Sequence, residues 1–121
     1  MSARILVIED QEDNRKIVRD LLTSVGYELC EATNGEEGVT MAEAWRPDLI
    51  LLDIQLPGID GYEVARRIKG NPALEKTPII AVTSYALSGD DVKAYAAGCD
   101  GYVTKPFSPR ALLAKIREYV P

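Results

Sequence analysis

The sequence contains no histidine, only two cysteines and no long apolar run. Without histidine, no imidazole can act as metal ligand, general base or phosphate carrier, so any such chemistry falls to carboxylates. Cys30 and Cys99 form no metal-binding or redox motif, and we interpret them as reduced, mostly buried small hydrophobic residues. No apolar stretch approaches the roughly 20 residues of a membrane span, and the N-terminus has no signal-peptide pattern. We therefore expect a cytoplasmic protein without membrane contact.

The charge balance is one-sided, with 19 acidic against 14 basic residues and a net charge of −5. This argues against direct nucleic-acid binding, which needs a basic surface. A hydrophobic fraction of 46% and a charged fraction of 27% are typical of a globular protein. A chain of this length can bury roughly two-thirds of its unfolded surface, so residues 1–121 are predicted to form one domain.

Three continuous apolar segments, residues 4–8, 49–53 and 78–82, have the pattern of strands buried on both faces of a parallel sheet. Two shorter or more mixed segments, residues 27–32 and 101–104, suit edge strands. Helical patterns separate these segments. The sequence therefore predicts an α/β fold, a five-stranded parallel sheet in the order 2-1-3-4-5 with helices on both faces, as in flavodoxin-like proteins.

The predicted helices have recognisable starts and apolar faces. Asn34, Asp60 and Ser108 are predicted N-caps, because their side chains can accept hydrogen bonds from the first helical turn. The predicted apolar positions are Ile17, Val18, Leu21, Leu22 and Val25 in the first helix, and Val92, Tyr95 and Ala96 in the fourth helix, residues 88–97. Since the second of these stripes is short, the fourth helix is predicted to be a labile element.

Chemically useful side chains recur at the carboxyl ends of the predicted strands. They are Glu9 and Asp10 after the first strand, Asp53 at the end of the third, Thr83 after the fourth and Lys105 after the fifth. In open α/β sheets ligands bind at this edge. We therefore expect these side chains to face one crevice.

Three carboxylates in one crevice need a counter-charge, because two anions ~5 Å apart at an effective dielectric constant of ~20 repel by roughly 3 kcal/mol. A divalent cation offsets this repulsion, and all-oxygen ligation favours Mg²⁺, with Mn²⁺ and Ca²⁺ as alternatives. Lys105 and Thr83 suit a phosphate, as a point charge and a hydroxyl donor. Asp53 is the candidate nucleophile, because carboxylates form acyl phosphates.

Each residue also has an ordinary interpretation. Asp53 could cap a loop, Thr83 could cap a strand end, and Lys105 could be a surface charge. We favour the phosphate site because four strands contribute suitable groups at the same end.

At these positions the chain resembles the receiver domain of two-component response regulators, of the stand-alone type, over essentially its whole length. The resemblance rests on five short motifs in order: IED at 8–10, LLD at 51–53, LPGIDG at 56–61, AVTS at 81–84 and YVTKPF at 102–107. It implies a phospho-acceptor with only self-phosphorylation and self-dephosphorylation chemistry, and not an enzyme that acts on a separate substrate.

The resemblance also implies a donor and a metal site. Asp53 would accept a phosphoryl group from a histidine kinase or histidine phosphotransfer protein. Mg²⁺ would be held by Asp10, by the Asp53 carboxylate and by the backbone carbonyl of Gln55, and Glu9 would reach it through water. Asn14, Arg15 and Val18 would lie beside the site where partner kinases dock.

For the phosphorylated state, the resemblance implies a second set of roles. Lys105, Thr83 and the backbone amide of Ser84 would bind the phosphoryl oxygens, and the bond from Lys105 to Pro106 would be cis. Thr83 and Tyr102 would act as the switch, reshaping the face made by the fourth helix, the fifth strand and the fifth helix. A downstream protein would recognise this face, because no output segment follows the last helix.

Three other functions remain open. A phosphatase with an aspartyl-phosphate intermediate usually carries a second Asp two residues after its nucleophile, where this chain has Gln55. A flavodoxin-like cofactor binder needs a phosphate-binding loop after the first strand, where residues 9–13 are acidic and would repel phosphate. A degenerate receiver that serves only as an adaptor would not need the complete set of acids, Thr83 and Lys105.

Overall fold

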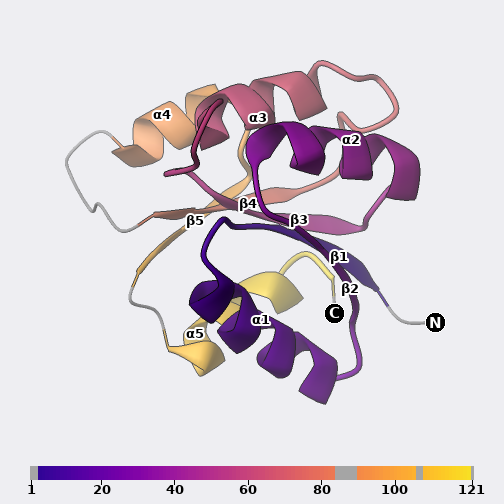
Figure 1. Ribbon diagram of the computed structural model, residues 1–121, viewed down its shortest axis with the longest axis vertical. Coiled ribbons are helices and arrows are strands. Elements are labelled where there is room, and N and C mark those ends of the chain that lie inside the picture. Colours follow the sequence, from indigo (N-terminus) through magenta and orange to yellow (C-terminus); the bar gives the residue numbers. More distant parts are fainter. Residues whose placement is uncertain (1–2, 84–89, 106–107, 121) are drawn as a thin grey trace.

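Five parallel strands form a single sheet in the order β2-β1-β3-β4-β5, which confirms the predicted topology (Figure 1). In chain order the strands are β1 Arg4–Ile8, β2 Glu28–Ala32, β3 Leu49–Asp53, β4 Ile79–Thr83 and β5 Gly101–Thr104. The structure is a computed structural model, and it describes residues 3–83, 90–105 and 108–120. Every residue of β3 and β4 is buried, in agreement with the run of four apolar residues in each; Asp53 and Thr83 end the two strands.

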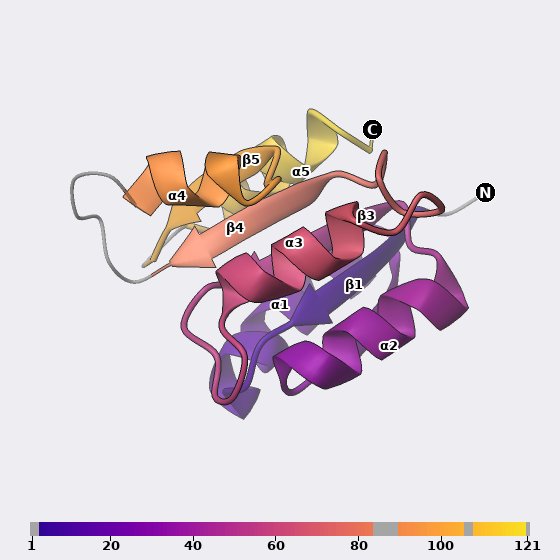
Figure 2. The same ribbon diagram turned by 90° about the horizontal axis from the view of Figure 1, so that it is seen from above.

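Helices cover both faces of the sheet (Figure 1). The helices on one face are α1 Glu12–Ser24 and α5 Pro109–Arg117, and those on the other are α2 Gly35–Trp45, α3 Gly61–Lys69 and α4 Asp90–Ala96. Seen from above, α2, α3 and α4 lie across the sheet in a layer of their own (Figure 2). The side chains of Asn34, Asp60 and Ser108 each accept a hydrogen bond from a backbone N–H three residues ahead, at 2.8, 2.9 and 3.0 Å. The three predicted N-caps are therefore confirmed.

Alternate residues of the central strands build two cores, one on each face of the sheet. In β1, Ile5 and Val7 pack in the core beneath α1 and α5, whereas Leu6 and Ile8 pack in the core beneath α2 and α3. This division follows from the two-residue period of a strand. Cys99 is buried in the second core, and both cysteines are free. Within the described ranges, no helix combines the length and the apolar character needed to cross a membrane.

The predicted apolar face of α1 is wrong in part. Val18 and Leu22 are buried, but Ile17 is 51% exposed and Val25 is 37% exposed. Val18 and Leu22 form an i, i+4 stripe on the sheet, and Ile17 is rotated from Val18 by about 100° around the helix axis, toward solvent.

The predicted apolar face of α4 is wrong as well. Val92 is 65% exposed and Tyr95 is 49% exposed, whereas Ala94 and Ala97 are buried. Small side chains allow a helix to approach a sheet closely, and here the alanine side of the helix faces inward. The larger apolar side chains therefore point to solvent. The predicted helix start at Ser88 lies outside the described residues.

Candidate functional site

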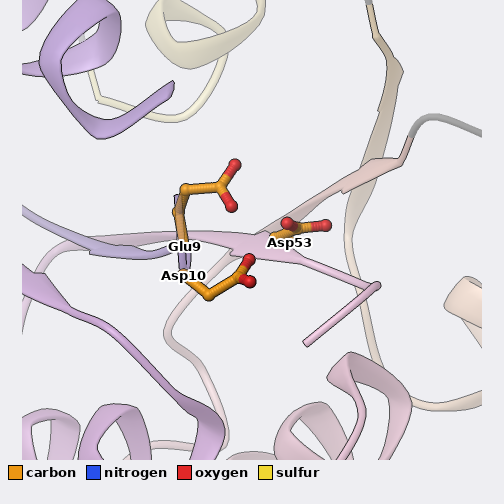
Figure 3. Close-up of side chains that lie close together, drawn as sticks. All are labelled: Glu9, Asp10 and Asp53. Carbon is orange, nitrogen blue, oxygen red and sulfur yellow. The ribbon is translucent and has the colours of Figure 1, made fainter. Parts of the chain in front are cut away.

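The ends of β1 and β3 bring three carboxylates together (Figure 3). These strands pair with Ile8 beside Leu52, so Glu9 comes level with Asp53. One carboxylate oxygen from each of Glu9, Asp10 and Asp53 lies within 4.8 Å of the others. Glu9 is 6% exposed and Asp53 is 5% exposed, so two of the three charges are held away from bulk water. Such a cluster is stable only with positive charge nearby.

Lys105 supplies part of that positive charge. Its Nζ lies 2.8 Å from Oε1 of Glu9 and 3.4 Å from Oδ2 of Asp53. Burial by itself lowers the pKa of Lys105, but the hydrogen bond to Glu9 and the charge of Asp53 outweigh it and raise this pKa above its ordinary value. Lys105 is therefore a fixed cation at neutral pH.

The acids retain an excess of negative charge despite Lys105. Burial is the main cause that raises the pKa of Glu9, the contact with Asp53 adds to it, and Lys105 opposes it. Burial and the contact with Glu9 also raise the pKa of Asp10. The donor atoms are all carboxylate oxygens, close enough to share one ion. This donor set fits a hard divalent cation such as Mg²⁺.

Thr83 and Gln55 border the acid cluster on the β4 side. Thr83 is 1% exposed, and its hydroxyl accepts a 2.7 Å hydrogen bond from the side-chain amide of Gln55. The backbone N–H of Gln55 donates to Oδ1 of Asp53 at 3.0 Å. The backbone N–H of Lys105 donates to the carbonyl of Thr83 at 2.6 Å. Gln55 thus links the candidate nucleophile, through its backbone N–H, to the candidate switch residue, through its side chain, and the sequence did not predict this link.

The structure brings several of the predicted site residues together. The residues that meet in the acid cluster are Glu9, Asp10, Asp53 and Lys105. Tyr102 is half-buried on edge strand β5 and packs against the core beneath α2 and α3. Ser84 and Pro106, with their predicted amide contact and cis bond, lie outside the described residues.

The start of α1 carries Arg15 and Val18, which were predicted to lie beside a docking site. Val18 is 6% exposed and belongs to the core beneath α1 and α5, so its side chain is closed to a partner protein, and its predicted place beside a kinase docking site stays a prediction. Arg15, also predicted to lie beside the docking site, folds its guanidinium back and donates a 2.8 Å hydrogen bond to the carbonyl of Glu9. The sequence feature that could have predicted this contact is an arginine in the first turns of a helix that follows a strand, because its long side chain can reach back to the end of that strand.

Magnesium is expected to stabilise the wild-type protein more than an Asp53→Asn variant. At tenfold excess over its dissociation constant, a ligand that binds only the folded state adds about 1.4 kcal/mol to the free energy of unfolding. Without metal, Asp53→Asn should be more stable than the wild type, because removal of one carboxylate relieves repulsion of about 1 kcal/mol. Thermal unfolding with EDTA and with Mg²⁺ measures both differences. Equal midpoints for the wild type in the two buffers would contradict the shared metal site.

Comparisons with known proteins agree with one another. Residues 5–117 match the family described as the response regulator receiver domain. The polar-differentiation response regulator DivK of Brucella anthropi is 40% identical over 120 residues, which cover 99% of this chain and 98% of DivK. Among solved structures, the chemotaxis response regulator CheY4 of Vibrio cholerae aligns with a TM-score of 0.94 at 28% identity, over 99% of this chain and 100% of that chain. The receiver domain of a sensor histidine kinase from Pseudomonas aeruginosa has a TM-score of 0.91 at 34% identity and 98% coverage of both chains, and its structure holds a magnesium ion coordinated in the active site cleft.

Proposed function

Because this chain belongs to the response regulator receiver domain family, we propose that it is a phosphorylation-dependent signalling switch with Asp53 as phospho-acceptor. A histidine kinase or a histidine phosphotransfer protein would donate the phosphoryl group. The position of Asp53 carries the proposal: this carboxylate ends the central strand, and Lys105 and two further acids surround it. The geometry supports a nucleophile beside an ammonium that can neutralise charge on an incoming phosphate.

In the transfer step, a carboxylate oxygen of Asp53 attacks phosphorus and forms a new P–O bond. The bond from phosphorus to the donor breaks, and its electron pair leaves with the donor, which is imidazole for phosphohistidine or acetate for acetyl phosphate. Lys105 neutralises a phosphoryl oxygen, and the hydroxyl of Thr83 and the backbone amide of Ser84 donate hydrogen bonds to the others. Lys105 can take this role because its Nζ already contacts Asp53.

For the metal we propose Mg²⁺, held by Asp10, by Asp53 and by the backbone carbonyl of Gln55, with Glu9 reaching it through water. When bound, Mg²⁺ offsets the negative charge of the acids and of the phosphoryl oxygens. Mn²⁺ is an alternative, because it accepts the same oxygen ligands. The carboxylate oxygens of Glu9, Asp10 and Asp53, which lie within 4.8 Å of one another, support a cation site here.

We further propose that the signal leaves through the α4, β5 and α5 face. Thr83 would move toward the phosphoryl group and Tyr102 would turn inward, which changes the contacts that this face offers to a downstream protein. Val92 and Tyr95 support this output, because α4 presents both of these large apolar side chains to solvent. A cytoplasmic location remains a prediction.

We propose no turnover of a separate substrate. In a phosphatase, a carboxyl group two residues after the nucleophile protonates the leaving group. Here Gln55 occupies that position, and its side-chain amide, which donates to Thr83, cannot act as an acid. Steady hydrolysis of a phosphate monoester by the purified protein would favour the phosphatase instead.

The intact mass of the protein after incubation with acetyl phosphate and Mg²⁺ tests the proposal. We expect a single phosphoryl adduct on the wild type, and none on Asp53→Asn or with EDTA. Asp20→Asn is the matched control, because Asp20 is an exposed acid that pairs with Lys16 on the outer side of α1, and it should leave the adduct unchanged. A folded protein that forms no adduct and binds no beryllofluoride would overturn the proposal, since the second probe does not depend on the lifetime of the phosphoryl group.

A further inference from the structure

Arg15 connects the acid cluster to its surroundings through an enclosed guanidinium. The side chain is only 12% exposed, although it lies near the start of a surface helix. Its Nη1 donates to the carbonyl of Glu9 at 2.8 Å, its Nη2 lies 2.5 Å from Glu12, and its Nε lies 3.3 Å from Glu31. One planar group therefore joins the end of β1, the first turn of α1 and edge strand β2.

These contacts hold the backbone of Glu9 from two sides. The N–H of Glu9 donates to the carbonyl of Ala32 at 3.0 Å, and its own carbonyl accepts from Arg15. The peptide that joins Glu9 to Asp10 therefore has a fixed orientation. Both acid side chains leave the backbone beside this peptide, so its orientation sets the directions of two of the three clustered carboxylates.

The acidic partners of Arg15 are themselves held in place by Arg19. Arg19 binds Glu31 with two hydrogen bonds of 2.7 Å and reaches Glu12 at 3.1 Å. Arg15 and Arg19 thus share the same two acidic partners, but only Arg15 contacts the backbone at the acid cluster. This difference provides a natural control within the chain.

We propose that Arg15 is a positioning residue for the cation site, which acts by orienting the peptide between Glu9 and Asp10. The proposal rests on the metal site of the proposed function and deepens it. Residues that orient the groups around a metal ion commonly change its affinity by about tenfold or more when they are replaced. A hydrogen bond from a charged guanidinium to a carbonyl is strong enough to supply such orientation.

The direction of the effect separates positioning from simple electrostatics. Arg15 carries a positive charge near the acid cluster and repels Mg²⁺. If only this charge mattered, replacing Arg15 with a neutral residue should strengthen Mg²⁺ binding. If its hydrogen bond orients the ligands, its removal should weaken binding instead. The two roles of Arg15 therefore predict opposite changes in Mg²⁺ affinity.

Calorimetric titration of the folded protein with Mg²⁺, without any phosphoryl donor, tests the proposal on the wild type, Arg15→Gln and Arg19→Gln. We expect affinity about tenfold weaker for Arg15→Gln and unchanged for Arg19→Gln. Unchanged or tighter binding by Arg15→Gln would overturn the positioning role, as would equal weakening in both variants. A wild type that takes up no Mg²⁺ would overturn the metal site itself, and the positioning role with it.

Arg15→Lys covers the case in which Arg15→Gln fails to fold. This variant keeps the positive charge, but an ammonium cannot reproduce the planar fork that reaches Glu9, Glu12 and Glu31 together. Positioning predicts weaker Mg²⁺ binding for Arg15→Lys than for the wild type. Affinity equal to that of the wild type would leave charge as the only contribution of Arg15 and overturn the proposal.

Discussion

A Lys105→Met variant is expected to lose about 3 kcal/mol of unfolding free energy in metal-free buffer at neutral pH, because removal of one partner from a buried ion pair leaves uncompensated charge. Lys105 contacts Glu9 at 2.8 Å and Asp53 at 3.4 Å, and these two side chains are 7% and 5% exposed. Methionine keeps most of the length of the side chain without its charge. The measured effect therefore reports the stranded carboxylates more than a loss of packing.

The pH dependence of this loss has a definite sign. Burial already raises the pKa of Glu9, and Lys105 is the group that holds it down, so the variant should have a Glu9 pKa raised further. An acid with a raised folded-state pKa destabilises the protein as pH rises through the interval between its unfolded and folded pKa values. The loss of unfolding free energy in Lys105→Met should therefore be largest at neutral pH and should shrink as the pH falls toward the ordinary pKa of a glutamate. Mg²⁺ should also reduce it, because the ion replaces the missing positive charge.

Urea unfolding of Lys105→Met beside Lys16→Met measures this effect. Lys16 pairs with Asp20 at 2.8 Å, but both side chains are more than 60% exposed. Such a surface pair contributes roughly 0.5 kcal/mol or less. Coincident unfolding curves for the two variants would contradict a buried, uncompensated acid cluster.

A Gly61→Ala variant is expected to lose about 3 kcal/mol, the upper part of the range for a forced close contact. A methyl group on Gly61 would lie 2.6 Å from the Cα of Ile54 and 2.7 Å from the carbonyl oxygen of Asp53. Both atoms belong to the backbone, so neither can move aside as a side-chain end could. The start of α3 must then separate from the end of β3, where the N–H of Gly61 now donates to the carbonyl of Ile54 at 3.0 Å.

Gly61→Ala should also impair phosphorylation, because it displaces the backbone of Asp53 and Ile54 at the end of β3. We expect slower formation of the acetyl phosphate adduct even where the variant remains folded. Gly58→Ala is the matched control in the same loop: its added methyl group meets nothing within 4 Å, and only its φ of +75° opposes the change. That strain costs about 1 kcal/mol. Gly58→Ala as unstable as Gly61→Ala would show that close approach of α3 to β3 is not the cause.

The strand order illustrates how far local sequence patterns reach. β1, β3 and β4 each carry four consecutive apolar residues and take the centre, whereas β2 and β5 are mixed or short and take the edges. Right-handed crossovers then leave few arrangements. The apolar faces of α1 and α4 show the limit. Ile17, Val92 and Tyr95 have the hydrophobicity of core residues, yet the exposure of each was decided by how its helix lies on the sheet.

The α/β architecture, and the set of acids, hydroxyl and ammonium at one edge of the sheet, can be read from the amino-acid sequence alone. Both depend on local properties: the period of apolar residues, and which residue ends each strand. Three contacts appear only in the folded chain: Lys105 reaches Glu9 across 96 positions, Gln55 turns its amide to Thr83, and Arg15 folds back onto the carbonyl of Glu9. These contacts depend on side-chain directions and on distances between elements remote in sequence, which no local pattern encodes.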